Sequence, residues 1–207
     1  MKPLLISDCD EVLLHMVRHF GDWLGEHHDI DLVPDGGEFS TLMQRRNGGT
    51  PPTREESWDY VNGFFPAEMH RQTLVPHAAD ALAALAERAD IVILNNLAEE
   101  CRVPRIEQLA AFGIAHRVQC NSGGKGGPVA RLAEEHGSSV TVFVDDLSHH
   151  HESVARHAPG VWRLHMVSEP SLAPHVPPSP SAHARIDDWR EAQAWIDARF
   201  AEGRPAI

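Results

Sequence analysis

The stretch Leu4–Leu14, LLISDCDEVLL, decides the fold of this chain. Its first part, Leu4 to Ser7, is short and apolar, as expected of a strand that is buried on both faces of a sheet. Asp8 and Asp10 follow with a single cysteine between them. Two carboxylates this close disfavour each other's charge unless a cation lies nearby or one of them holds a proton. The stretch therefore predicts a buried strand that ends in a chemically active site.

The composition is that of a globular protein with a sizeable hydrophobic core. The chain has 207 residues, of which 42% are hydrophobic and 23% charged, and its formal net charge is -12. This charge argues against non-specific binding to nucleic acid or to an anionic membrane surface. No apolar run approaches the roughly 20 residues that a membrane span needs. We therefore expect neither nucleic acid nor a membrane as a partner.

The N-terminal residues and the cysteines indicate a reducing compartment. The start MKPLLISDCD lacks the longer apolar region and the small-residue cleavage site of a signal peptide. Cys9, Cys101 and Cys120 are odd in number and lack the CxxC spacing of zinc and redox sites. We expect reduced thiols in a cytoplasmic protein, whose oligomeric state the sequence does not indicate.

Strand patterns alternate with helical patterns along the rest of the chain. Apolar runs at Asp90–Asn96 and Val140–Asp146 and weaker runs at His116–Asn121 and Val161–Val167 bring the expected strands to five. Helical patterns lie at 77–89, 105–113 and 128–137. In the second of these, Ile106, Leu109 and Ala110 are expected on the buried face, and the proline-rich segment 168–184 is expected to be a surface loop. The alternation predicts a parallel sheet with helices on both faces.

The interval 14–76 does not follow this alternation. Apolar residues recur there at helical spacing, and Thr53 and Glu56 stand in the register of a capping box. We expect residues 14–76 to form an α-helical insertion, and residues 1–13 together with 77–207 to form the core domain.

Polar residues follow the three clearest strands, and the carboxyl ends of parallel strands meet at one edge of a sheet. They are Asp8 and Asp10 after the first strand, Asn95 and Asn96 at the end of the second, and Asp145 and Asp146 at the end of the last. Lys125 stands in the glycine-rich loop NSGGKGGP just before a helix. Several carboxylates favour a hard cation such as Mg2+, which is usually held by one or two carboxylates plus substrate phosphate.

In this order the four segments resemble the motifs of the haloacid dehalogenase (HAD) superfamily. ISDCDEVL is similar to its first motif, VILNN to the second, Lys125 to the third and VFVDDLS to the fourth. The resemblance spans Met1 to about Val167, and the insertion stands where the family carries a C1-type helical cap. It implies a Rossmann-like α/β core with such a cap.

The resemblance also implies a role for each motif residue. Asp8 would be the nucleophile that forms an aspartyl-phosphate, and Asp10 would protonate the leaving group and then activate water. Mg2+ would be held by Asp8, Asp145 and the backbone carbonyl of Asp10, with Asp146 in support. Lys125 would neutralise Asp8 and the phosphoryl oxygens.

Two positions refine the expected activity. Phosphatase-like members of the family have a second Asp at the place of Asp10, whereas dehalogenase-like members do not, which favours phosphate ester hydrolysis. The second motif normally ends its strand with Ser or Thr, but this chain has Asn95, whose amide can donate the same kind of hydrogen bond. If the alignment slides by one residue, Asn96 takes that place.

The expected function is Mg2+-dependent hydrolysis of a small phosphorylated metabolite. The alternatives are a nucleoside monophosphate phosphatase, a catalytically weak protein that binds a phosphorylated ligand or a protein partner, and, more distantly, a dehalogenase. Which metabolite is the substrate does not follow from these residues.

Further candidates lie in the insertion and after the fourth motif. Arg45 and Arg46 could meet an anionic group of the substrate, although solvent exposure explains most loop arginines. Core packing explains most of the aromatic residues that could form a wall of the site, namely Trp58, Tyr60, Phe64 and Phe65. The run His149–His151 is expected at a solvated helix start, because three consecutive side chains do not easily reach one metal ion. Contact between one of these histidines and the substrate stays open.

Overall fold

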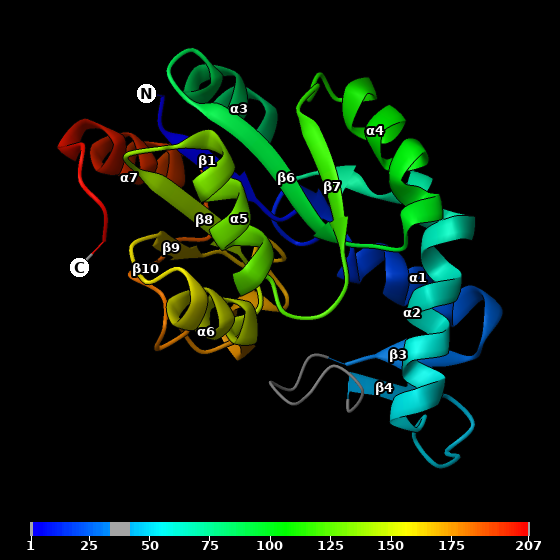
Figure 1. Cartoon of the computed structure of the whole chain (residues 1–207). Helices are drawn as coiled ribbons and strands as arrows, with labels where there is room; N and C mark the ends of the chain where they lie inside the picture. Colours follow the sequence, from blue (N-terminus) through cyan, green and yellow to red (C-terminus); the bar gives the residue numbers. More distant parts are fainter. Residues whose placement is uncertain (1, 34–41, 207) are drawn as a thin grey trace.

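A parallel sheet forms the centre of the molecule. A computed structural model describes residues 2–33 and 42–206. Six strands make up the main sheet, namely β1 (Leu4–Ser7), β6 (Asp90–Asn96), β7 (Arg117–Asn121), β8 (Thr141–Asp145), β9 (Trp162–His165) and β10 (Ala184–Arg185). They lie in the order β10-β9-β8-β1-β6-β7, and every neighbouring pair is parallel (Figure 1). The Rossmann-like α/β fold is confirmed, and β10 adds a sixth strand that was too short to leave a sequence pattern.

Helices cover both faces of this sheet (Figure 1). One face packs against α3 (Ala78–Ala86), α4 (Arg102–Ala111) and α7 (Trp189–Glu202), and the other against α5 (Gly126–His136) and α6 (Ser148–His157). Along β1, Leu5 belongs to the first apolar cluster, while Leu4 and Ile6 belong to the second. Cys9 lies in the cluster of Leu5. It therefore faces away from Asp8, as the alternation of a strand predicts.

The buried face of α4 differs from the predicted one. Arg105 and Leu109 are buried, whereas Ile106 is 38% exposed and Ala110 is also exposed. The prediction was wrong because a hydrophobic pattern assigns arginine to solvent, while here the guanidinium of Arg105 has a carboxylate partner inside the protein, Asp10.

The chain between β1 and α3 forms the insertion. It contains α1 (Val17–His27), β3 (Ile30–Leu32), β4 (Met43–Arg45) and α2 (Arg54–Glu68), and β2 (Leu14–His15) pairs with β5 (Thr73–Leu74) at its root. The predicted capping box is present at the start of α2, where Thr53 and Glu56 each accept a hydrogen bond from the other's backbone N–H. The insertion is mostly helical, as predicted, and also contains the antiparallel pair β3 and β4.

An apolar cluster separate from the two around the sheet holds the insertion together. Phe20, Leu24 and Phe64 belong to it, and Leu97 and Val167 join it from the core. The domain boundaries given above stay a prediction. No helix in the described part of the chain is long and apolar enough to cross a membrane.

Candidate functional site

The carboxyl ends of β1, β6 and β8 bring the motif residues to one edge of the sheet. Ser7 of β1 is in register with Ile93 of β6 and Val144 of β8, so the next residues of all three strands lie at the same level. The Asp8 N–H continues the ladder by donating to the carbonyl of Val144 (2.8 Å). Asp8 and Asp145 are consequently neighbours across adjacent strands.

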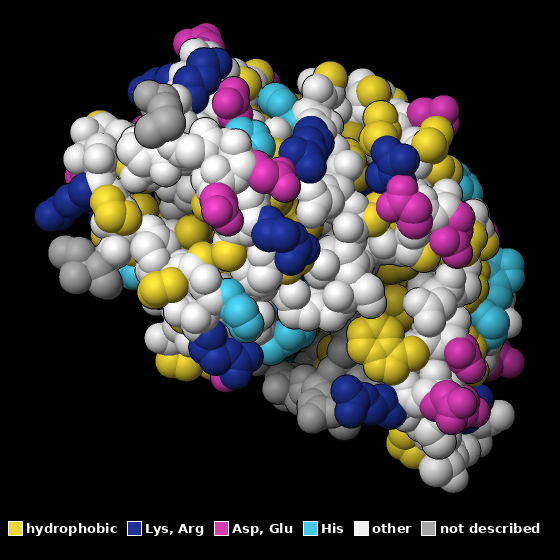
Figure 2. Space-filling model, in the orientation of Figure 1, with side chains coloured by type: hydrophobic (Ala, Val, Ile, Leu, Met, Phe, Trp, Pro, Cys, Tyr) yellow, Lys and Arg dark blue, Asp and Glu magenta, His cyan; other side chains and the backbone are white. Residues whose placement is uncertain are grey.

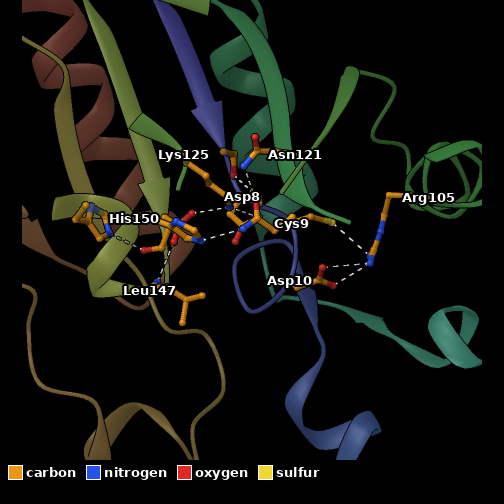
Figure 3. A network of polar contacts seen from close by, with 12 residues as sticks. Asp8, Cys9, Asp10, Arg105, Asn121, Lys125, Leu147 and His150 are labelled. Atoms are coloured by element: carbon orange, nitrogen blue, oxygen red, sulfur yellow. Dashed lines mark hydrogen bonds and ion pairs between the residues drawn. The ribbon is translucent and has the colours of Figure 1, made fainter. Parts of the chain in front are cut away.

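Lys125 completes this centre from the start of α5. Its side chain is fully buried, and its Nζ lies 2.7 Å from Asp8 Oδ1 and 2.6 Å from Asp145 Oδ2 (Figure 3). The next residue, Gly126, lets α5 approach α6, because a Cβ there would meet the carbonyl oxygen of Ser153 at 2.2 Å. The missing side chain of Gly126 thus allows the helix start that places the Lys125 ammonium between two carboxylates.

Burial and mutual charge set the protonation of this centre. Burial raises the pKa of Asp8 to about 7, an effect that Lys125 opposes and Asp145 reinforces. Burial also acts to raise the pKa of Asp145, but opposing contributions, the largest of them from the ammonium of Lys125, together outweigh it and the pKa is lowered. Burial acts to lower the pKa of Lys125, but the two carboxylates together have the larger effect, so its pKa is raised. Asp145 and Lys125 are therefore charged at neutral pH, and Asp8 is close to its titration point.

The donor set at this edge fits a hard divalent cation. Asp8, Asp145 and Asp146 each offer an oxygen, and the three atoms lie within 4.8 Å of one another. Loss of hydration, then the charges of Asp145 and Asp8, raise the pKa of Asp146 well above its ordinary value. Three carboxylates crowded in this way are the oxygen ligands that Mg2+ prefers, and a cation would relieve their repulsion. The carboxylate of Asp10 does not belong to this group.

Asp10 instead points to a second cation, Arg105 of α4. The Arg105 Nη2 lies 2.9 Å from Asp10 Oδ1 and 3.3 Å from Oδ2 (Figure 3). Gln72 also donates from Nε2 to Asp10 Oδ1 (2.6 Å). Arg105 is fully buried, and its Nη1 contacts Cys9 Sγ at 3.4 Å. Burial acts to lower the pKa of Arg105, but opposing contributions, the largest of them from Asp10, together outweigh it and the pKa is raised. Sequence reasoning missed Arg105 and Gln72, since neither belongs to a motif.

The two asparagines of the second motif have different surroundings. Asn95 is 2% exposed, and its Nδ2 has no hydrogen-bond partner among the described residues. Asn96 donates to the carbonyl of Gly123 (2.9 Å) and accepts from Asn121 Nδ2 (2.7 Å). The amide of Asn95 is thus the one left with an unused donor in the part of the chain that is described.

Two of the three consecutive histidines are buried, so the expectation of a solvated helix start was wrong for them. His151 Nε2 lies 2.9 Å from the carbonyl oxygen of Asp145, and Asn96 Nδ2 lies 3.3 Å from His150 Nε2. Burial lowers the pKa of His151, and it lowers that of His150 to about 4. Both rings are therefore neutral, and His151 supports the fourth motif while His150 contacts the second. These histidine rings become buried because α6 packs against α5. The polar pattern SHHHES does not indicate that burial.

The candidate arginines of the insertion are already paired there. Arg45 Nη2 lies 2.9 Å from Glu56 Oε1, and Arg46 Nε lies 2.8 Å from Asp31 Oδ1. The structure does not bring them to the carboxylates of the core.

A cleft of about 650 Å³ lies between α2 and the strand ends. Trp58, which is 56% exposed, and Phe65 line it from the insertion, and Asn96, Asn121 and His149 line it from the core. Figure 2 shows the surface hollowed between the insertion and the core. Of the four aromatic candidates, Trp58 and Phe65 thus face a space that a ligand could enter, while Phe64 is fully buried.

Comparison with known proteins gives matches of structure. No family model matches the sequence, and no curated protein matches it. The magnesium-bound HAD-hydrolase YfnB from Bacillus subtilis is similar with a TM-score of 0.61 and 14% identity, covering 95% of this chain and 99% of that one. A predicted phosphoglycolate phosphatase from Haemophilus somnus is similar with a TM-score of 0.59 and 15% identity, covering 93% and 97%. A defluorinating L-2-haloacid dehalogenase is similar with a TM-score of 0.58 and 12% identity, covering 95% of each chain.

These proteins carry out different reactions on one architecture, so the likeness establishes architecture alone. It extends over nearly the whole length of the chain, and three of the four motifs stand at strand ends, with Lys125 at the start of α5. The chain therefore has the fold of the haloacid dehalogenase-like hydrolases.

Proposed function

We propose that this chain is a phosphohydrolase that cleaves a phosphate monoester of a small metabolite through an aspartyl-phosphate. The observation that carries the proposal is the buried ammonium of Lys125, 2.7 Å from Asp8 and 2.6 Å from Asp145. A fixed positive charge beside a carboxylate nucleophile stabilises the negative charge of a phosphoryl group during transfer. The full-length likeness to hydrolases, one of them described as a phosphatase, supports this reading.

Two displacement steps at phosphorus make up the reaction. An oxygen of Asp8 attacks phosphorus, the bond from phosphorus to the ester oxygen breaks, and that oxygen takes a proton from Asp10. A water molecule then gives a proton back to Asp10 and attacks the same phosphorus atom. The bond to Asp8 breaks, inorganic phosphate leaves, and both aspartates return to their starting states.

The other polar residues of the edge hold the reacting groups. Asp8, Asp145 and Asp146 would hold Mg2+, which when bound supplies positive charge to the phosphoryl oxygens and favours the ionised form of Asp8. The unused donor of Asn95 suits a phosphoryl oxygen. Arg105 and Gln72 position Asp10.

A nucleoside monophosphate is the second candidate substrate class. The indole of Trp58 is more than half exposed on the wall of the cleft that Asn96 and Asn121 also line. An exposed aromatic face beside amide donors and acceptors suits the stacking and hydrogen bonding of a base. A catalytically weak protein that binds a phosphorylated ligand or a protein partner is the rival from a different class, and a dehalogenase is more distant.

The test is hydrolysis of a panel of phosphorylated metabolites, including nucleoside monophosphates, by purified protein with Mg2+. Asp8→Asn and a metal-free reaction serve as controls. We expect phosphate release from one class of compound that disappears in both controls. Phosphate release that survives Asp8→Asn would contradict the mechanism, and chloride release from a haloacid would favour the dehalogenase. Faster turnover of nucleotides that is lost in Trp58→Ala would select the second candidate.

A further inference from the structure

Glu11, His15 and Glu169 form a second cluster of potential ligands, separate from the carboxylates at the strand ends. Glu11 lies in the turn after β1, His15 in β2 at the root of the insertion, and Glu169 after β9. They are 3%, 4% and 4% exposed, and one ligand atom of each lies within 4.8 Å of the others. The proposed reaction uses none of them.

Two atoms of this cluster are buried without a hydrogen-bond partner among the described residues. They are Glu11 Oε2 and His15 Nδ1. The His15 Nδ1 lies 3.8 Å from Glu169 Oε2, which is too far for a hydrogen bond. A buried polar atom without a partner is costly, and native structures leave few of them. Two unpartnered atoms in a cluster whose ligand atoms lie within 4.8 Å of one another make it a candidate ligand site.

The other oxygen of each carboxylate accepts hydrogen bonds from nearby groups, and these bonds fix the two carboxylates in place. Glu11 Oε1 accepts from the backbone N–H groups of Met16 (2.7 Å) and Val17 (2.6 Å), at the start of α1. Glu169 Oε1 accepts from the hydroxyl of Ser171 (2.8 Å). Hydrogen bonds of this kind orient metal ligands in proteins.

We propose that Glu11 Oε2, His15 Nδ1 and Glu169 Oε2 bind one divalent transition-metal ion, such as Zn2+ or Mn2+. Two carboxylate oxygens and one imidazole nitrogen are a ligand set that these ions accept. Mg2+ prefers oxygen ligands alone, so the imidazole distinguishes this site from the one formed by the aspartates.

Burial lowers the pKa of His15 and raises the pKa of Glu11 to about 7. A bound dication would favour the neutral imidazole and the ionised carboxylate that it needs as ligands. Arg18 already donates from Nε to Glu169 Oε2 (2.6 Å), so this oxygen would be shared between the guanidinium and the metal ion. The site joins the root of the insertion to the segment after β9, so a bound metal ion would tie these two parts of the chain together.

The test uses Co2+, whose visible absorption bands report ligands and geometry, together with calorimetric titration. We expect two Co2+ sites per chain in Mg2+-free buffer, one of which persists in a large excess of Mg2+. His15→Gln should lose the persistent site, since it removes the only nitrogen ligand of the set. His19→Gln, a histidine one turn along the chain whose Nε2 contacts Thr73, is the matched control and should keep both sites.

The proposal is overturned if Mg2+ displaces all Co2+ from the wild-type chain, or if His15→Gln keeps the persistent site. Thermal unfolding without metal shows whether His15→Gln folds, and if it does not, the wild-type titration in excess Mg2+ decides alone. Asp8→Asn should retain the persistent site, so failure of the proposed phosphohydrolase function leaves this test unaffected.

Discussion

The two aspartates of the first motif stand two residues apart, yet each pairs with a cation from a different part of the molecule (Figure 3). Asp8 lies against Lys125, and both belong to the strand and helix framework of the core. Asp10 lies against Arg105 of the core and Gln72 of the insertion. The surroundings of the proposed nucleophile are therefore independent of the insertion, whereas those of the proposed acid and base depend on where the insertion lies.

The surroundings of Asp8 and Asp10 also differ in the residues that support them. Neutral histidines support the Asp8 side, where His151 contacts the backbone carbonyl of Asp145 and His165 contacts that of Asp146. The Asp10 side is backed by a single arginine held within hydrogen-bonding reach of Cys9. The comparison shows that the position of Asp8 depends on charged groups within the strands and helices of the core. The position of Asp10 depends on a contact between the core and the insertion.

The largest expected effect is on the Asp8 side. Asp8→Asn removes the nucleophile and should lower kcat on the order of 10⁴-fold or more. Asp10→Asn should cost less, about 10²–10⁴-fold, because it removes general acid and base catalysis only. Steady-state kinetics on the best substrate of the panel measures both. Equal losses in the two variants would contradict the separate roles assigned here.

Removing the ammonium between the two carboxylates should reduce both activity and stability. Lys125→Met leaves Asp8 and Asp145 buried without their cation, which should cost about 3–5 kcal/mol of unfolding free energy. Loss of the preorganised charge should lower kcat about 10²–10³-fold. Denaturant unfolding and kinetics measure the two effects. A variant as stable as the wild type would show that the ion pairs do not stabilise the fold.

Arg105→Met tests the Asp10 side in the same way. It leaves the carboxylate of Asp10 with Gln72 alone and should cost about 3 kcal/mol of unfolding free energy, since the partner removed is fully buried. We expect kcat to fall by more than KM changes, because Asp10 loses its position while the phosphate site stays intact. Arg105→Lys keeps the positive charge but loses the two-pronged hydrogen bonding of the guanidinium. Its stability and kcat should therefore lie between those of the wild type and Arg105→Met. An unchanged kcat in Arg105→Met would show that Arg105 does not position Asp10.

Acid should weaken the Asp8 side through its histidines. His165 accepts from the N–H of Ser179 at Nδ1 (3.0 Å) and contacts Asp146 through Nε2, and burial lowers its pKa to about 4. Between pH 4 and about 6.5 the unfolded chain binds a proton that the folded chain does not. Stability should therefore fall as pH decreases through this window, by about 1.4 kcal/mol per pH unit for one such histidine.

Chemical unfolding between pH 7 and pH 4 measures this slope. His165→Gln preserves one donor and one acceptor without a titratable ring, and should make the slope shallower by the contribution of one histidine. An unchanged slope would mean that His165 does not control acid stability.

The smallest effect is expected where the insertion contacts Asp10. Gln72→Met removes one hydrogen bond to a carboxylate and should cost about 1 kcal/mol. If the insertion positions Asp10, kcat should also fall a few-fold with little change in KM. A double variant with Arg105→Lys should show non-additive losses, because both residues contact the same carboxylate. Additive losses would mean that Gln72 and Arg105 act on Asp10 independently of each other.

Much of the core was predictable because its signals are local. Apolar runs of four to seven residues marked β1, β6 and β8, and polar residues at their ends marked the edge where the proposed site lies. The 20-residue step from Lys125 to Asp145 is likewise a local property of one helix and one strand. The insertion was harder, since β3 and β4 have three residues each and leave no alternating pattern.

The sequence by itself determined the order of strands and helices, the polar residues at the strand ends and the place of the insertion. Only the tertiary structure decided that Arg105 meets Asp10 across 95 positions of the chain, and that His15 and Glu169 come together with Glu11. The physical reason is that periodicity records which side chains avoid water. Burial of a charged or titratable side chain depends on a partner, and that partner is fixed by the fold.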